Sequence, residues 1–95
     1  MCSNIVETGA IAGSGRGADG WFELNQTVVT FDHLVHVAAE HAVSIDFVNY
    51  DRGVGARVAV ELTAESAREL VRVIEAALSA SEAQHLPSGP LAAAR

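Results

Sequence analysis

The chain has 95 residues, of which 49% are hydrophobic, so it is long enough for one folded domain and too short for two. Twelve acidic residues against six basic ones give a net charge of −6, the wrong sign for binding a nucleic-acid backbone or an anionic membrane surface. No apolar run approaches the roughly 18 residues needed to cross a bilayer, and the N-terminus lacks the cationic start of a secretory signal. We therefore expect a soluble, cytoplasmic protein that binds neither nucleic acid nor a membrane.

The N-terminal third predicts two extended segments separated by a glycine loop. Residues 5–12 are mildly apolar and lead into residues 13–20, where four glycines disfavour regular structure. Residues 21–31 are rich in aromatic and β-branched side chains, which is typical of a long strand.

Two further strands are predicted at 42–50 and 56–62, because apolar and polar residues alternate in both. The glycine-containing segment between them predicts a hairpin. Apolar positions are odd-numbered in the first strand and even-numbered in the second, so they share a face only if opposed residue numbers sum to an odd number. A sum of 105 pairs Phe47 with Val58 and leaves a four-residue loop, 51–54.

Apolar residues then recur at helical spacing up to about Ala83, following Thr63, which is a good N-cap. The predicted fold class is α+β, with a small antiparallel sheet of about four strands and one C-terminal amphipathic helix packed on one face. Residues 1–83 form the single domain and residues 84–95 a mobile tail. Because one helix cannot cover a four-stranded sheet, we expect a homodimer.

Residues 31–41 hold three of the four histidines together with two carboxylates. Imidazole and carboxylate groups suit either a divalent-metal site or proton transfer near neutral pH, and they can also simply satisfy backbone groups at strand ends. The spacing does not choose among these. If the segment continued as a strand, His33 and His36 would point to opposite faces, so a shared metal requires the chain to turn near Leu34.

Three residues outside this segment are also candidates. Trp21 borders the glycine loop, where it either walls a ligand pocket or belongs to the core, and Arg16 adds a cation. A phosphate-binding loop leads directly into a helix, whereas these glycines lead into the strand that Trp21 opens, so a flap or a plain hairpin loop is expected. The register in which opposed residue numbers sum to 105 sets Asp46 opposite Ala59. Asp46 is there either a solvated surface residue or, if a second subunit covers that face, a partly buried acid or base.

Six motifs stand out along the chain: GSGRGADGWF at 13–22, FDH at 31–33, VH at 35–36, AEH at 39–41, IDF at 45–47 and ARVAVEL at 56–62. Together they resemble a family of small actinobacterial proteins of unknown function, over roughly residues 8–80. The family pattern has a proline between the first two histidines, where this chain has Leu34, so the resemblance does not supply a rigid turn there. The chain also resembles a small Pictet–Spengler cyclase of an aminoquinone antibiotic pathway, which implies condensation of a tryptophan-like amine with an aldehyde.

We therefore expect a cofactor-free acid/base enzyme of natural-product biosynthesis that forms a tetrahydro-β-carboline from an aromatic amine and an aldehyde. The expected catalytic residues are Asp32, His33, Glu40 and Asp46, the expected substrate-binding residues are Trp21, Arg16, His36 and His41, and no metal is assigned. The alternative is a noncatalytic protein that binds a small molecule or a divalent metal through His33, His36 and His41.

Overall fold

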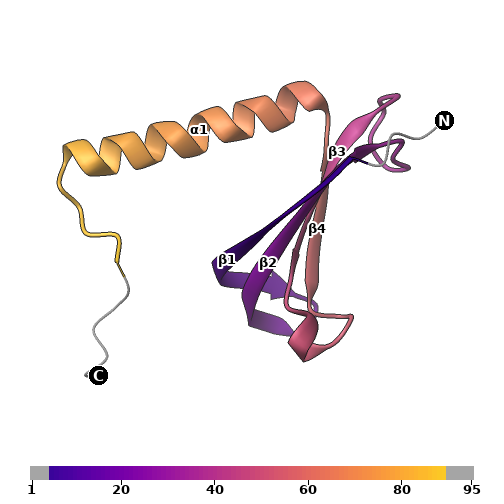
Figure 1. The fold of residues 1–95 in the computed structure, drawn as a ribbon, viewed down its shortest axis with the longest axis horizontal. Helices are drawn as coiled ribbons and strands as arrows, with labels where there is room; N and C mark the ends of the chain where they lie inside the picture. Colours follow the sequence, from indigo (N-terminus) through magenta and orange to yellow (C-terminus); the bar gives the residue numbers. More distant parts are fainter. Residues whose placement is uncertain (1–4, 90–95) are drawn as a thin grey trace.

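The computed structural model describes residues 5–89 and contains a four-stranded antiparallel sheet followed by one helix (Figure 1). The strands are β1 (Ile5–Gly17), β2 (Gly20–Asp32), β3 (Ala42–Val48) and β4 (Arg57–Leu62), and they lie side by side in chain order. A short 3₁₀ turn, η1 (Tyr50–Arg52), joins β3 to β4, and α1 (Ala64–Ala83) follows β4. The predicted α+β fold class is confirmed.

The prediction of a glycine loop over residues 13–20 was wrong, because residues 13–17 belong to β1 and Gly20 begins β2. Residues 13–17 pair with the start of β2, from Gly13 opposite Leu24 to Gly17 opposite Gly20, and only Ala18 and Asp19 connect the strands. The ladder supplies backbone hydrogen bonds that offset the entropy lost by ordering glycine. Gly20 has a φ of +112°, which L-residues rarely adopt, and this conformation lets the hairpin close.

The predicted register between β3 and β4 is confirmed: Phe47 lies opposite Val58, and Asp46 lies opposite Ala59. The predicted four-residue loop was too short, because β3 ends at Val48 and β4 begins only at Arg57, so the connection runs from Asn49 through η1 to residue 56. Strand pairing gives the sheet an apolar face and a polar face. The apolar face carries Thr27, Val29, Phe31, Val43, Ile45, Phe47, Val58, Val60 and Leu62. The polar face carries Gln26, Val28, Thr30, Asp32, Ala42, Ser44, Asp46, Val48, Arg57, Ala59 and Glu61.

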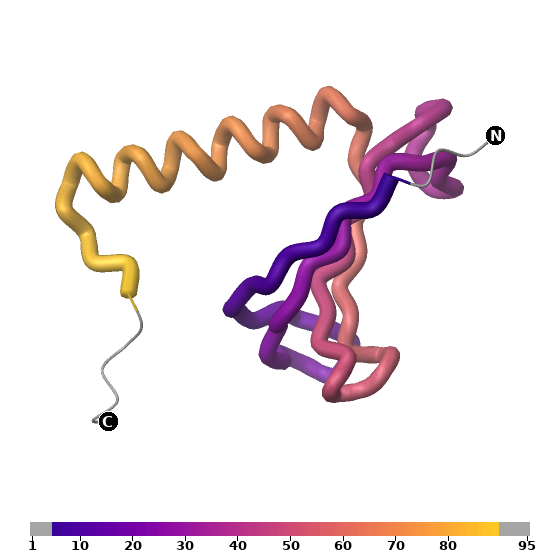
Figure 2. The backbone as a smooth tube through the Cα atoms, viewed as in Figure 1, coloured from indigo at the N-terminus to yellow at the C-terminus, as the bar shows by residue number. Residues whose placement is uncertain are grey.

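The buried core is small. Among the described residues, its hydrophobic side chains are that of Ala42, at the start of β3, and those of Leu24 and Val48, toward the η1 end of the sheet. The end of β1 bends across the sheet here, so that a Cβ on Gly15 would lie 3.1 Å from Leu24 and 3.2 Å from Val58 (Figure 2). Glycine at this position therefore permits the close packing of β1 over β4.

The helix begins as predicted, because the Thr63 hydroxyl accepts a hydrogen bond of 3.1 Å from the Ser66 backbone N–H. It packs against the sheet through its first turns and then extends away from it (Figures 1 and 2). It ends at Ala83, and the mobile tail predicted from residue 84 lies partly outside the described residues. No helix within residues 5–89 combines the length and apolar character needed to span a bilayer.

Candidate functional site

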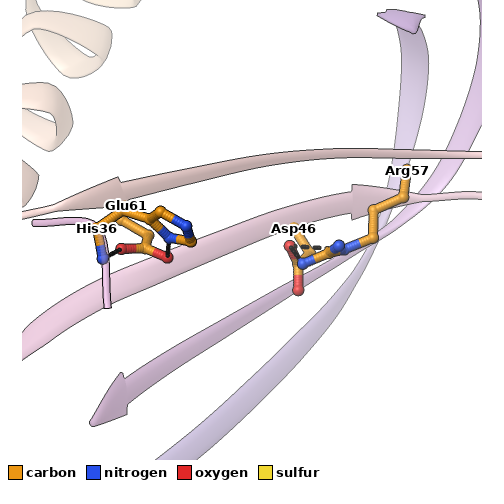
Figure 3. A network of polar contacts seen from close by, with 4 residues as sticks. All are labelled: His36, Asp46, Arg57 and Glu61. Carbon is orange, nitrogen blue, oxygen red and sulfur yellow. Dashed lines mark hydrogen bonds and ion pairs between the residues drawn. The ribbon is translucent and has the colours of Figure 1, made fainter. Parts of the chain in front are cut away.

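The connection between β2 and β3 turns back over the polar face of the sheet and brings His36 to Glu61 of β4 (Figure 3). The Glu61 carboxylate accepts two hydrogen bonds from this one residue. One is 3.0 Å long from the His36 backbone N–H to Oε1, and the other joins Nδ1 of the imidazole to Oε2 at 2.9 Å. Two contacts to one carboxylate fix both the backbone and the ring of His36.

The two partners differ in exposure, with 24% of the Glu61 side chain and 82% of the His36 side chain accessible to solvent. The hydrogen bond from the His36 side chain is the main cause that lowers the pKa of Glu61 below its ordinary value. An ionised carboxylate at Nδ1 favours the ring tautomer that carries its proton on that nitrogen. In the neutral ring, Nε2 is then left as a proton acceptor.

A second charged pair, Asp46 with Arg57, lies further along the polar face (Figure 3). Oδ1 of Asp46 accepts a hydrogen bond of 3.1 Å from Nε of Arg57, and Nη2 of the same guanidinium lies 2.9 Å from Oδ1 in the ion pair. The Asp46 side chain is 20% exposed and the Arg57 side chain 54%. The charge of the Asp46 carboxylate is thus balanced by the Arg57 guanidinium.

A depression of about 480 Å³ lies between the two pairs. Its lining includes His36 and Glu61 at one end, Arg57 at the other, and Ala59 between them. Ala59 leaves this space open because its side chain is a single methyl group on the strand that carries both Arg57 and Glu61. The volume falls within the range of small-molecule sites, and a proton acceptor and a cation border it.

The remaining histidines of the connection do not join His36. The rings of His33 and His41 lie 4.1 Å apart, and His41 also stacks on Phe31 at 5.7 Å. Asp32 accepts a hydrogen bond of 2.7 Å from the His33 backbone N–H, while Glu40 is exposed. The chain does turn after β2, but within residues 5–89 no three His, Cys, Asp or Glu side chains converge as metal ligands.

Trp21 and Arg16 lie opposite each other at the far end of the β1–β2 hairpin. Trp21 is 71% exposed and borders a separate depression of about 360 Å³, which Gly17, Asp19 and Arg52 also line. Trp21 stands near one end of β2 and Asp32 at the other, up to about 36 Å apart along a straight strand. Within a single chain, Trp21 therefore does not lie beside the histidine segment at residues 31–41.

Sequence reasoning missed Glu61 and Arg57 as candidate residues. The signal was present in the predicted register, which already placed both side chains on the same face as Asp46. Ala59 lies opposite Asp46, and Arg57 is two positions from Ala59 on the same face, so its long side chain can reach the Asp46 carboxylate. The pairing of His36 with Glu61 had no such signal, because 25 residues separate the partners and the connection has no regular structure.

Comparison with known proteins gives one match. The model of a family of unknown function, DUF6295, matches residues 1–87. No curated protein and no solved structure matches the chain significantly. Since the match covers nearly the whole sequence, the chain belongs to the DUF6295 family.

Proposed function

We propose that the depression on the polar face is a cofactor-free acid/base site, with His36 as the general base and Glu61 as the residue that positions it. The observation that carries the proposal is the double hydrogen bond from His36 to the Glu61 carboxylate. A carboxylate that holds Nδ1–H of a histidine is the arrangement that directs Nε2 toward a substrate proton. Asp32, Glu40 and Asp46 were the expected catalytic carboxylates, and this proposal gives the role of positioning His36 to Glu61.

Each wall of the depression has a part in the proposed chemistry. Nε2 of His36 accepts a proton from a bound molecule, and Glu61 stabilises the imidazolium that forms. Arg57 lies at the other end and offers the N–H groups that Asp46 does not engage to an anionic or carbonyl group of the ligand. Ala59 leaves room for a flat ring to lie between them.

The reaction that we propose for this site is the Pictet–Spengler condensation expected from the sequence, which places the protein in natural-product biosynthesis. An amine and an aldehyde first lose water to give an iminium ion, and attack by the indole carbon then forms the new C–C bond. The indole carbon that formed this bond must finally lose its proton, which restores the aromatic ring. His36 is suited to both proton transfers, since its imidazolium form can protonate the departing hydroxyl and its neutral form can accept the ring proton.

The test combines an assay with two matched variants. Purified protein is incubated with tryptophan and an aldehyde, and formation of the tetrahydro-β-carboline is followed by chiral chromatography. His36→Gln should lose about 10²-fold to 10⁴-fold in rate, as expected when a general base is removed. His33→Gln is the control, because it removes a histidine of the same connection that does not contact Glu61.

A measurement without substrate tests the positioning role of Glu61. Nitrogen-15 NMR of the imidazole should show His36 with its proton on Nδ1 in the wild type, and Glu61→Gln should weaken this preference. Racemic product at the uncatalysed rate would exclude the Pictet–Spengler reaction. Equal activity of His36→Gln and wild type in any turnover would contradict the acid/base role of His36, and the absence of any turnover would leave a noncatalytic binding site.

A further inference from the structure

The helix α1 carries an apolar stripe that its own sheet does not cover. None of its residues is buried, although Leu70, Val71, Ile74 and Leu78 recur at helical spacing. These four side chains are between 37% and 56% exposed. A hollow of about 280 Å³ between the first turns of the helix and the apolar face shows that even the contacting end is not sealed.

The dimensions of the chain agree with an uncovered surface. The Cα radius of gyration is 15.8 Å, whereas a compact chain of this length has about 12.4 Å. The accessible surface is 7402 Å², whereas a compact chain of 9.9 kDa exposes about 5200 Å². The excess is larger than the roughly 800 Å² that each partner contributes to a stable interface.

We infer that α1 pairs with α1 of a second copy, antiparallel, about a two-fold axis that passes near Ile74. The stripe is close to symmetric about this residue. Leu70 and Leu78 lie four positions before and after it, and Ala67 and Ser81 lie seven positions before and after it. A two-fold axis at Ile74 therefore sets each leucine against a leucine of the other copy and leaves the small residues at both ends of the contact.

The charges on the helix are compatible with this pairing. Val73 lies on one side of the stripe, and Glu75 and Glu82 lie with Arg68 on the other side, beyond Val71. These charged residues are roughly 80–120° of helix rotation away from Ile74. The ion pair of Glu69 with Arg72, at 2.6 Å, lies on the opposite side of the helix and stays in solvent. The charged residues therefore lie outside the apolar contact itself, and a self-complementary stripe favours a second copy over an unrelated partner.

This inference does not depend on the acid/base site, and the oligomeric state tests it directly. Light scattering during size-exclusion chromatography should give about 20 kDa, twice the mass of the chain, at micromolar concentration. Ile74→Glu sets two carboxylates against each other at the axis and should weaken the dimer by about 100-fold or more. Ala76→Glu is the matched control, because it adds the same group on the outer side of the helix and should leave the dimer intact.

Cross-linking tests the geometry of the pair without disturbing the fold. In a Cys2→Ser background, which removes the one native cysteine, Ile74→Cys should form an intermolecular disulfide under copper-phenanthroline oxidation. Packed helices bring facing Cα atoms to within about 4–6 Å, which a disulfide can span. Ala76→Cys should cross-link far more slowly. A monomeric wild type at 100 µM, or faster cross-linking through Ala76→Cys, would overturn the inference.

Discussion

Replacement of Asn49 by alanine should remove one of the strongest local constraints on the sheet. Asn49 is 4% exposed, and its side chain forms hydrogen bonds with three residues in two elements of the chain. Its amide nitrogen donates to the Glu23 carbonyl at 3.0 Å, and its amide oxygen accepts from the Asp51 backbone N–H at 3.1 Å and from Asn25 at 3.3 Å. The side chain therefore ties β2 to the start of η1.

The size of the effect follows from these contacts. A hydrogen bond contributes about 1 kcal/mol net, and a partly buried group left without its partner costs more than that. Because the Asn25 bond is long and partly exposed, we expect Asn49→Ala to lower the free energy of unfolding by about 2–3 kcal/mol. A domain of this size has only about 5–15 kcal/mol in total, so the melting temperature should fall by about 10–20 °C.

Urea denaturation followed by circular dichroism measures this change, and two further variants test the reasoning. Asn25→Ala removes only bonds of 3.3 Å and 3.4 Å and should cost about 1 kcal/mol or less. Asn49→Asp keeps the acceptor but loses the donor to Glu23. Its stability relative to wild type should recover as pH falls, because a protonated carboxyl can donate to that carbonyl. Equal losses for Asn49→Ala and Asn25→Ala would refute the argument.

Three other predictions concern the pair on the polar face, the bend of β1 and the helix start. The hydrogen bond to His36 lowers the pKa of Glu61, so the stability that Glu61 contributes is complete above the ordinary carboxyl pKa of 4.5 and is lost as pH falls below that value. Glu61→Gln should therefore flatten this part of an acid-denaturation curve. Gly15→Ala should cost about 1–2 kcal/mol in urea, because the new methyl group would meet three side-chain carbons at 3.1–3.2 Å, while Gly13→Ala has open space and should not show this loss. Thr63→Ala removes the N-cap bond and should cost about 1 kcal/mol, and an unchanged thermal midpoint would show that the cap does not limit stability.

The His36 site shows where sequence reasoning reached its limit. The sequence identified the histidine segment as the place of interest, because three imidazoles in eleven residues are visible without a fold. It could not choose which histidine has a carboxylate partner. That choice depends on how an irregular connection turns over the sheet, and such a turn leaves no periodic pattern in the residues.

The pocket expected between Trp21 and the histidines is the opposite case. Both groups were plausible ligand contacts when considered one by one. The sequence also predicted that a strand separates them, and an extended strand carries its two ends far apart in proportion to its length. The structure places Trp21 near one end of β2 and Asp32 at the other. The two groups that were expected to form one site are therefore far apart within a single chain.

By itself, the sequence determined the local features of the fold. Alternation of apolar and polar residues specified β3 and β4 and their register, and the helical spacing after Thr63 specified α1, because each of these patterns follows from the period of one element. Tertiary structure alone decided the rest. The glycines of β1 became a strand because β2 supplies their hydrogen bonds, and the helix left its apolar stripe uncovered because only its first turns reach the sheet. These outcomes depend on contacts between distant segments, which no local pattern encodes.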